Sequence, residues 1–68
     1  MPEYVKRMLQ EKEDLEGKIK RAKKAVENPP YGMDLEDKNY LETQIGYMEQ
    51  YLDVLNRRIQ KAGGNNAK

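Results

Sequence analysis

The apolar residues between positions 41 and 62 recur at alternating steps of four and three. They are Leu41, Ile45, Met48, Leu52, Leu55, Ile59 and Ala62. This heptad spacing is typical of a helix that packs along its whole length against other helices. A second apolar row, formed by Tyr40, Tyr47, Tyr51 and Val54, lies beside the first. The apolar surface is therefore wider than one partner helix covers, and this surplus predicts that the chain assembles with copies of itself.

The same spacing occurs near the N-terminus, where it predicts a helix at about residues 3–27. Its apolar positions are Val5, Met8, Leu15, Ile19, Ala22 and Val26, and Lys12 occupies the one heptad position that lacks an apolar residue. Pro2 and Glu3 suit the start of a helix, because proline is tolerated in the first turn and a carboxylate complements the positive end of the dipole.

Two prolines separate the helical patterns. Pro29 and Pro30 end the first helix, Gly32 permits a sharp turn, and Asp34 is a suitable N-cap for a second helix at about residues 35–62. The loop 28–34 is short enough to make the helices antiparallel neighbours. We therefore expect one domain over residues 1–68, with a flexible tail at 63–68.

The expected fold is all-α, an antiparallel two-helix hairpin that assembles into a helical homo-oligomer. Folding about the loop pairs positions whose numbers sum to 63 or 64, which brings apolar residues of one helix against those of the other. Gly17 and Gly46 also meet in this register. Because glycine weakens a helix interior, we expect a close backbone approach there, of the helices or of a ligand.

The composition argues against an enzyme. The chain has no Cys, His or Ser, and Thr43 is its only aliphatic hydroxyl, so most nucleophiles and general bases are missing. No metal site and no cofactor are indicated, and the scattered carboxylates give no support for one. No apolar run approaches the ~20 residues of a membrane span. The sequence reads as that of a soluble, intracellular protein.

The net charge of +1 conceals a basic block at residues 18–24, which holds five cations in seven residues. One interpretation is a solvated helix end that pairs with Asp14, Glu16 and Glu42. The other is a phosphate-binding site for a nucleic acid or a nucleotide. The block has more positive charge than these acids balance, and both interpretations stay open.

Tyr4 lies on the same helical stripe as Lys18, fourteen residues away. A tyrosine there can pack at an interface or stack on a base. Because fourteen residues extend about 21 Å along a helix, one small ligand cannot reach both residues in one chain. Antiparallel packing of this helix on its copy brings Tyr4 of one chain near Lys18 of the other. Arg57, Arg58 and Lys61 form a second basic cluster, expected beside Tyr4, that suits phosphate recognition as well as dipole compensation.

Residues 4–8, 11–19 and 47–59 resemble a family of small phage proteins, the helical-hairpin sponges that counter bacterial CBASS immunity. These share a hairpin domain with Thoeris anti-defence sponges. The resembling segments are Tyr4-Val5-Lys6-Arg7-Met8, Glu11-Lys12-Glu13-Asp14-Leu15-Glu16-Gly17-Lys18-Ile19 and Tyr47-Met48-Glu49-Gln50-Tyr51-Leu52, followed by Leu55-Asn56-Arg57-Arg58-Ile59.

The resemblance implies a non-enzymatic homo-oligomer, commonly a hexamer, in the cytoplasm of an infected bacterium. Such proteins bind cyclic oligonucleotide second messengers between protomers and so block antiphage signalling. The base-stacking role would fall on Tyr4 and the phosphate contact on Lys18, with Lys20 as its alternative. Some members bind cyclic trinucleotides at a threefold axis, and Arg57 and Arg58 are the candidates considered there, without a residue-by-residue match.

Two other functions remain open. The hairpin is compatible with an RNA- or DNA-binding module that uses the basic block against a phosphate backbone, and with a structural oligomerisation hairpin that binds no ligand. The salt dependence of binding distinguishes the RNA- or DNA-binding module from a sponge, because binding to a phosphate backbone releases counterions and so weakens steeply as the salt concentration rises.

Overall fold

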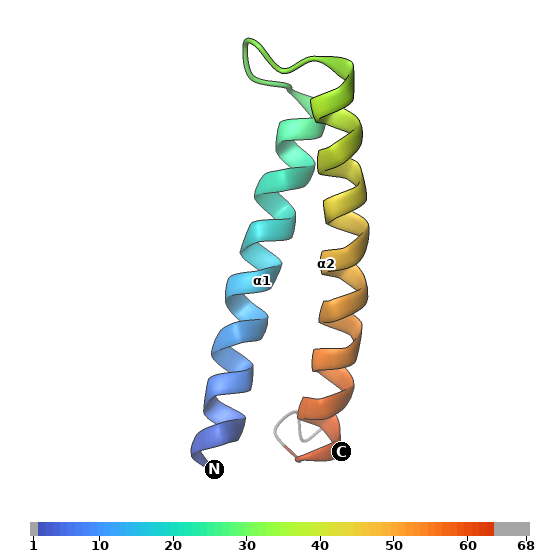
Figure 1. The fold of residues 1–68 in the computed structure, drawn as a ribbon. Coiled ribbons are helices and arrows are strands. Elements are labelled where there is room, and N and C mark those ends of the chain that lie inside the picture. Colours follow the sequence, from blue (N-terminus) through green and yellow to red (C-terminus); the bar gives the residue numbers. More distant parts are fainter. Residues whose placement is uncertain (1, 64–68) are drawn as a thin grey trace.

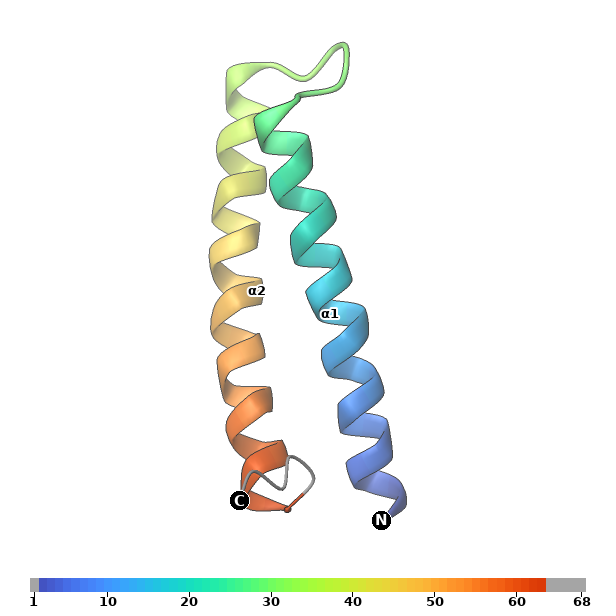
Figure 2. The same ribbon diagram turned by 180° about the vertical axis from the view of Figure 1, so that it is seen from behind.

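The computed structural model describes residues 2–63 and shows two helices packed side by side. Helix α1 spans Glu3–Glu27 and helix α2 spans Leu35–Lys61. The start of α1 and the end of α2 lie at the same end of an elongated molecule, in Figure 1 and from behind in Figure 2. The molecule measures 45 × 18 × 16 Å. The all-α antiparallel hairpin expected from the sequence is confirmed.

The ends of the helices follow from local chemistry. Asn28 donates its backbone N–H to the Lys24 carbonyl at 2.9 Å, and Pro29 then prevents further helical bonds. Gly32 turns the chain with φ of 94°, a conformation that other residues rarely adopt. The Asp34 carboxylate accepts from the Asp37 N–H at 2.9 Å and so caps α2. Helix α2 ends one residue before the expected position, and residues 64–68 of the expected tail lie outside the described residues.

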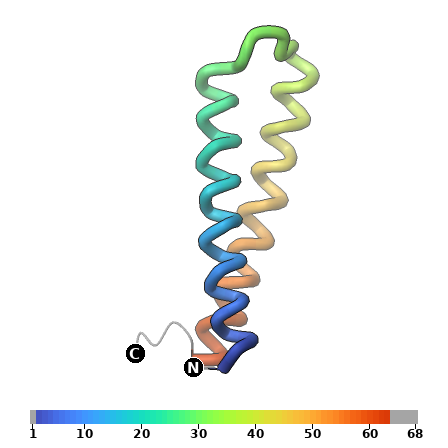
Figure 3. Tube along the Cα trace, turned by 90° about the vertical axis from the view of Figure 1, so that its left-hand side faces the viewer, coloured from blue at the N-terminus to red at the C-terminus, as the bar shows by residue number. Residues whose placement is uncertain are grey.

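The apolar seam forms two core clusters. The first joins Val5, Met8, Leu55 and Ile59 near the helix termini, and the second joins Leu15, Ile19 and Ile45 nearer the loop. Between them lies Lys12, half-buried at the interrupted heptad position. The pairs Val5–Ile59, Met8–Leu55 and Ile19–Ile45, derived from the register, each fall within one cluster. Figure 3 shows that the helices are inclined to each other along this seam.

The expected meeting of Gly17 and Gly46 is wrong. A Cβ atom built on Gly46 meets nothing within 4 Å, and one on Gly17 meets only the guanidinium of Arg21, at 3.2 Å. Two residues that lie at the same height along the hairpin need not face each other. Since Gly46 follows the seam residue Ile45 by one position, it is rotated from the seam by about 100°. Among residues 2–63, no contact between the helices accounts for either glycine.

The second apolar row of α2 stays largely exposed in the hairpin formed by residues 2–63. Tyr40, Tyr47, Tyr51 and Val54 keep between 45% and 69% of their surface exposed. Neither helix in the described part of the chain combines the length and the apolar character needed to cross a membrane.

Candidate functional site

Tyr4 lines a shallow hollow where the start of α1 meets the end of α2. The hollow has a volume of about 440 Å³, and its other lining residues are Met8, Arg58, Lys61 and Ala62. Met8 belongs to the buried core, while Tyr4 is 54% exposed. The site therefore presents an aromatic ring and two cations over an apolar floor, an arrangement that suits a base stacked beside a phosphate.

The structure separates the two neighbouring arginines. Arg58 lines the Tyr4 hollow together with Lys61, as the expected cluster implied. Arg57 does not line it, and its Nε lies 3.1 Å from Oδ2 of Asp53 in an ion pair one turn away on α2. Successive residues of a helix are rotated by about 100°, so the two guanidinium groups leave α2 in different directions.

A hydrogen bond between the helices shows which residues share a side of the hairpin. The Tyr51 hydroxyl donates to the Glu11 carboxylate across the seam. Glu11 lies midway between Tyr4 and Lys18, seven residues from each, so these three residues form one stripe of α1. The stripe and the exposed apolar row of α2 therefore share one side. We call this side the tyrosine face and define it by Tyr4, Tyr40, Tyr47, Tyr51 and Val54.

Lys18 is exposed on the stripe at the far end from Tyr4, about 21 Å along α1. It does not line the Tyr4 hollow. The predicted pair of Tyr4 and Lys18 is therefore not brought together within one chain, in agreement with the length of helix that separates them.

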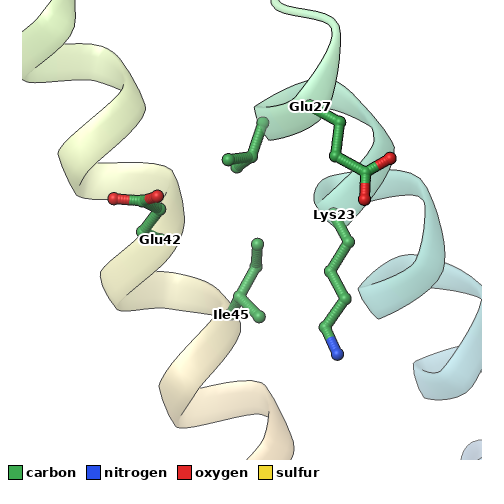
Figure 4. Close-up of a pocket in the computed structure, with 5 residues that line it drawn as sticks. Lys23, Glu27, Glu42 and Ile45 are labelled. Atoms are coloured by element: carbon green, nitrogen blue, oxygen red, sulfur yellow. The ribbon is translucent and has the colours of Figure 1, made fainter.

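Lys20 lies on the opposite edge of the seam. It lines a hollow of about 340 Å³ with Glu16, Ile19, Lys23, Glu49 and Leu52. Figure 4 shows the adjoining hollow, where Ile45 points into the space between the helices and Lys23, Glu27 and Glu42 stand around it. Acidic side chains surround Lys20 on this edge, which makes the position less suited to a phosphate than the Tyr4 hollow.

The basic block does not pair as one interpretation expected. Its ion pair in the described part of the chain joins Lys23 Nζ to Glu49 Oε2 at 2.7 Å, rather than involving Asp14, Glu16 or Glu42. Lys18, Lys20, Arg21 and Lys24 are exposed, and among residues 2–63 none of them is in an ion pair.

Sequence reasoning placed Arg58 and Lys61 beside Tyr4 but did not single out Met8 and Ala62 as parts of the same hollow. The four-residue spacings from Tyr4 to Met8 and from Arg58 to Ala62 could have indicated them. Within residues 2–63, acidic side chains form no group of three or more that could hold a metal ion.

Comparison with known proteins gives one result. A family model described as Sequestin matches residues 2–61, which include both helices and the loop between them. No curated protein and no solved structure matches the chain.

Proposed function

Because this chain belongs to the Sequestin family, we propose that it is a non-enzymatic sponge that sequesters cyclic oligonucleotide second messengers and so blocks host antiphage signalling. The family name supports sequestration in general. The observation that carries the choice of ligand is the Tyr4 hollow, where an exposed ring lies beside Arg58 and Lys61.

The hollow offers the two interactions that a cyclic nucleotide requires. Stacking of a base on an aromatic ring contributes about 1–3 kcal/mol and tolerates any base. Arg58 and Lys61 supply charge-assisted hydrogen bonds to a phosphate, with the planar guanidinium able to bind two oxygens at once. Both cations lie at the end of α2, and the helix fixes their positions beside the Tyr4 ring.

The size of the hollow supports binding between protomers. Its volume of about 440 Å³ lies near the lower end of the roughly 300–1,000 Å³ typical of small-molecule sites. One chain would thus cover part of a cyclic dinucleotide, and a second protomer would cover the rest with Lys18. Lys20 is the less favoured phosphate contact because of the acids around it. A hexamer and a second site for cyclic trinucleotides involving Arg57 or Arg58 stay predictions from the resemblance.

Adjacent arginines provide a matched test. In titrations of a fluorescent cyclic dinucleotide, we expect Arg58→Ala to weaken binding about 10- to 150-fold, the equivalent of a charged hydrogen bond of roughly 1.5–3 kcal/mol. Arg57→Ala removes the same charge one residue away and should change the affinity by less than about threefold. An equal loss of affinity in both variants would mean that net charge alone matters, and it would contradict the assignment of the Tyr4 hollow as the binding site.

Tyr4 has its own matched control. Tyr4→Ala should weaken binding by at least about tenfold, since it removes a stacked base, whereas Tyr31→Ala, at the fully exposed loop tip, should leave it unchanged. Both variants should keep the helical signal and the oligomeric state of the parent protein. A Tyr4→Ala variant that binds normally would refute the site.

The four exposed cations of the basic block favour a second candidate function, binding to an RNA or DNA backbone. Neutralising four phosphates predicts a log–log salt slope of about −3 to −4. The sponge predicts a shallower slope, because much of its affinity comes from stacking. Tight duplex or hairpin binding with the steep slope, and no response to cyclic nucleotides, would establish this function instead. A protein that binds neither class would be a structural hairpin.

A further inference from the structure

We infer that the hairpin opens as two separate units that meet at Lys12, and that opening of the unit farther from the loop dismantles the Tyr4 hollow. This unit, which we call the open-end half, consists of residues 3–11 of α1 and 54–61 of α2, at the end of the molecule opposite the loop (Figure 1). The loop half comprises residues 13–53. Each half contains one of the two core clusters.

Lys12 interrupts the apolar seam between the two halves. A leucine at this heptad position would pack against both clusters, whereas the half-buried Lys12 belongs to neither. Its side chain lines a hollow of about 400 Å³ with Lys6, Glu13 and Glu16, so charged groups flank the seam at this level. Because apolar packing makes neighbouring segments unfold together, the break at Lys12 weakens the coupling between the halves.

The two halves also differ in what joins their helices. In the loop half the chain itself connects α1 to α2, and Lys23 forms an ion pair with Glu49 across the seam at 2.7 Å. Among residues 2–63, no hydrogen bond and no ion pair joins residues 3–11 to residues 54–61. The open-end half is therefore held together by its apolar cluster.

The loop fixes the order in which the halves open. Separation of the open-end half leaves the loop half folded, whereas separation of the loop half alone would leave a closed loop of about 40 residues, which costs conformational entropy. The two segments of the open-end half are short, and isolated helices of fewer than about 12–15 residues are marginal in water. Once apart, these segments lose their helical hydrogen bonds, and their amides exchange with solvent.

Opening of this half has a direct consequence for the proposed function, on which this step rests. Tyr4 lies in the first turn of α1, while Arg58 and Lys61 lie in the last turns of α2, and all three line the hollow over Met8. The hollow exists only while the cluster beneath it is closed. A nucleotide that spans both helices therefore binds the closed form alone, and the closed fraction scales its apparent affinity.

Hydrogen exchange read residue by residue tests the two units without any nucleotide. In the parent protein, amides at 7–11 and 54–60, corrected for their intrinsic rates, should exchange at least about tenfold faster than those at 15–22 and 41–50. Equal rates in both halves would contradict the inference, because the hairpin would then open as one unit.

A pair of isoleucine-to-valine variants distinguishes separate opening from global unfolding. Ile19 and Ile59 are both buried, one in each cluster. Separate opening leaves Ile19 packed, so Ile19→Val should speed exchange in the loop half about 2- to 10-fold and leave the open-end half unchanged. Ile59→Val should speed exchange in both halves by a similar factor, because unfolding of the whole hairpin also exposes Ile59. Equal acceleration of both halves by Ile19→Val would overturn the inference.

A second pair of variants locates the boundary. Lys12→Leu supplies an apolar contact to the open-end cluster and should slow exchange at residues 54–60, on the opposite helix, about 3- to 10-fold. Lys6→Leu makes the same change at an exposed position of α1. Because lysine and leucine have similar helix propensities, this control should change the rates by less than about twofold. Simple fraying of the helix ends predicts no change at residues 54–60 in either variant, and that result would refute a boundary at Lys12.

The link to the binding site has its own readout. A cyclic dinucleotide at about 100 times its dissociation constant should slow exchange at residues 7–11 and 54–60 by about 100-fold, because the ligand binds only the closed form. A protein that binds the nucleotide in titrations, yet keeps its exchange rates in the open-end half, would overturn the link. Since the two units are tested without nucleotide, their failure and failure of the proposed function are distinguishable.

Discussion

The core cluster near the helix termini predicts that Leu55→Ala strongly destabilises the hairpin. Leu55 is fully buried and belongs to one cluster with Val5, Met8 and Ile59. Truncating a buried leucine to alanine costs about 3–5 kcal/mol, through lost transfer energy and the cavity left behind. A chain of 68 residues has a total free energy of unfolding of about 3–10 kcal/mol. The substitution therefore removes between about a third of the stability and all of it.

The matched control is the neighbouring Val54, which is 52% exposed and lies outside both core clusters. Val54→Ala should change the free energy of unfolding by less than about 0.5 kcal/mol. The assay is urea unfolding followed by far-ultraviolet circular dichroism, at protein concentrations low enough that the midpoint no longer depends on concentration. Equal losses for both variants, or a Leu55→Ala variant as stable as the parent, would refute the seam through which α1 and α2 pack.

Two other stability predictions follow from local geometry. Asp34→Ala removes the side chain that caps α2 and should lower the free energy of unfolding by about 1 kcal/mol, as measured by urea unfolding; an unchanged midpoint would mean that the cap contributes nothing. Gly46→Ala adds a methyl group to open space and should raise the stability of the hairpin by about 1 kcal/mol in the same assay. A stabilised hairpin that associates less well in sedimentation would locate a protein contact at Gly46, and a destabilised hairpin would contradict the observed geometry.

The hairpin was predictable because several local signals agree with one fold. Heptad spacing set the buried faces, Pro29 and Pro30 fixed the end of α1, and Asp34 marked the start of α2. The register followed from the short loop. The pairing of Gly17 with Gly46 failed because a register gives only the height of a residue along the helix, and the direction of its side chain also depends on its rotation about the axis.

The difference between the height of a residue along a helix and its rotation about the axis also explains why only part of the candidate site could be predicted. The sequence placed Arg57 and Arg58 together, because they are adjacent, yet their rotation about α2 puts Arg58 in the Tyr4 hollow and Arg57 beside Asp53. Lys20 was grouped with Lys18 by proximity and lies on the opposite edge of the seam. Side-chain contacts such as the bond from Tyr51 to Glu11 depend on rotamers that no spacing rule specifies.

Native mass spectrometry of the purified protein, alone and with a panel of cyclic di- and trinucleotides, tests the central claim most directly. The account predicts a homo-oligomer that gains defined nucleotide masses and that loses them on Tyr4→Ala while the assembly persists. A protein that gains none of these masses under conditions in which the oligomer stays intact would contradict the sponge.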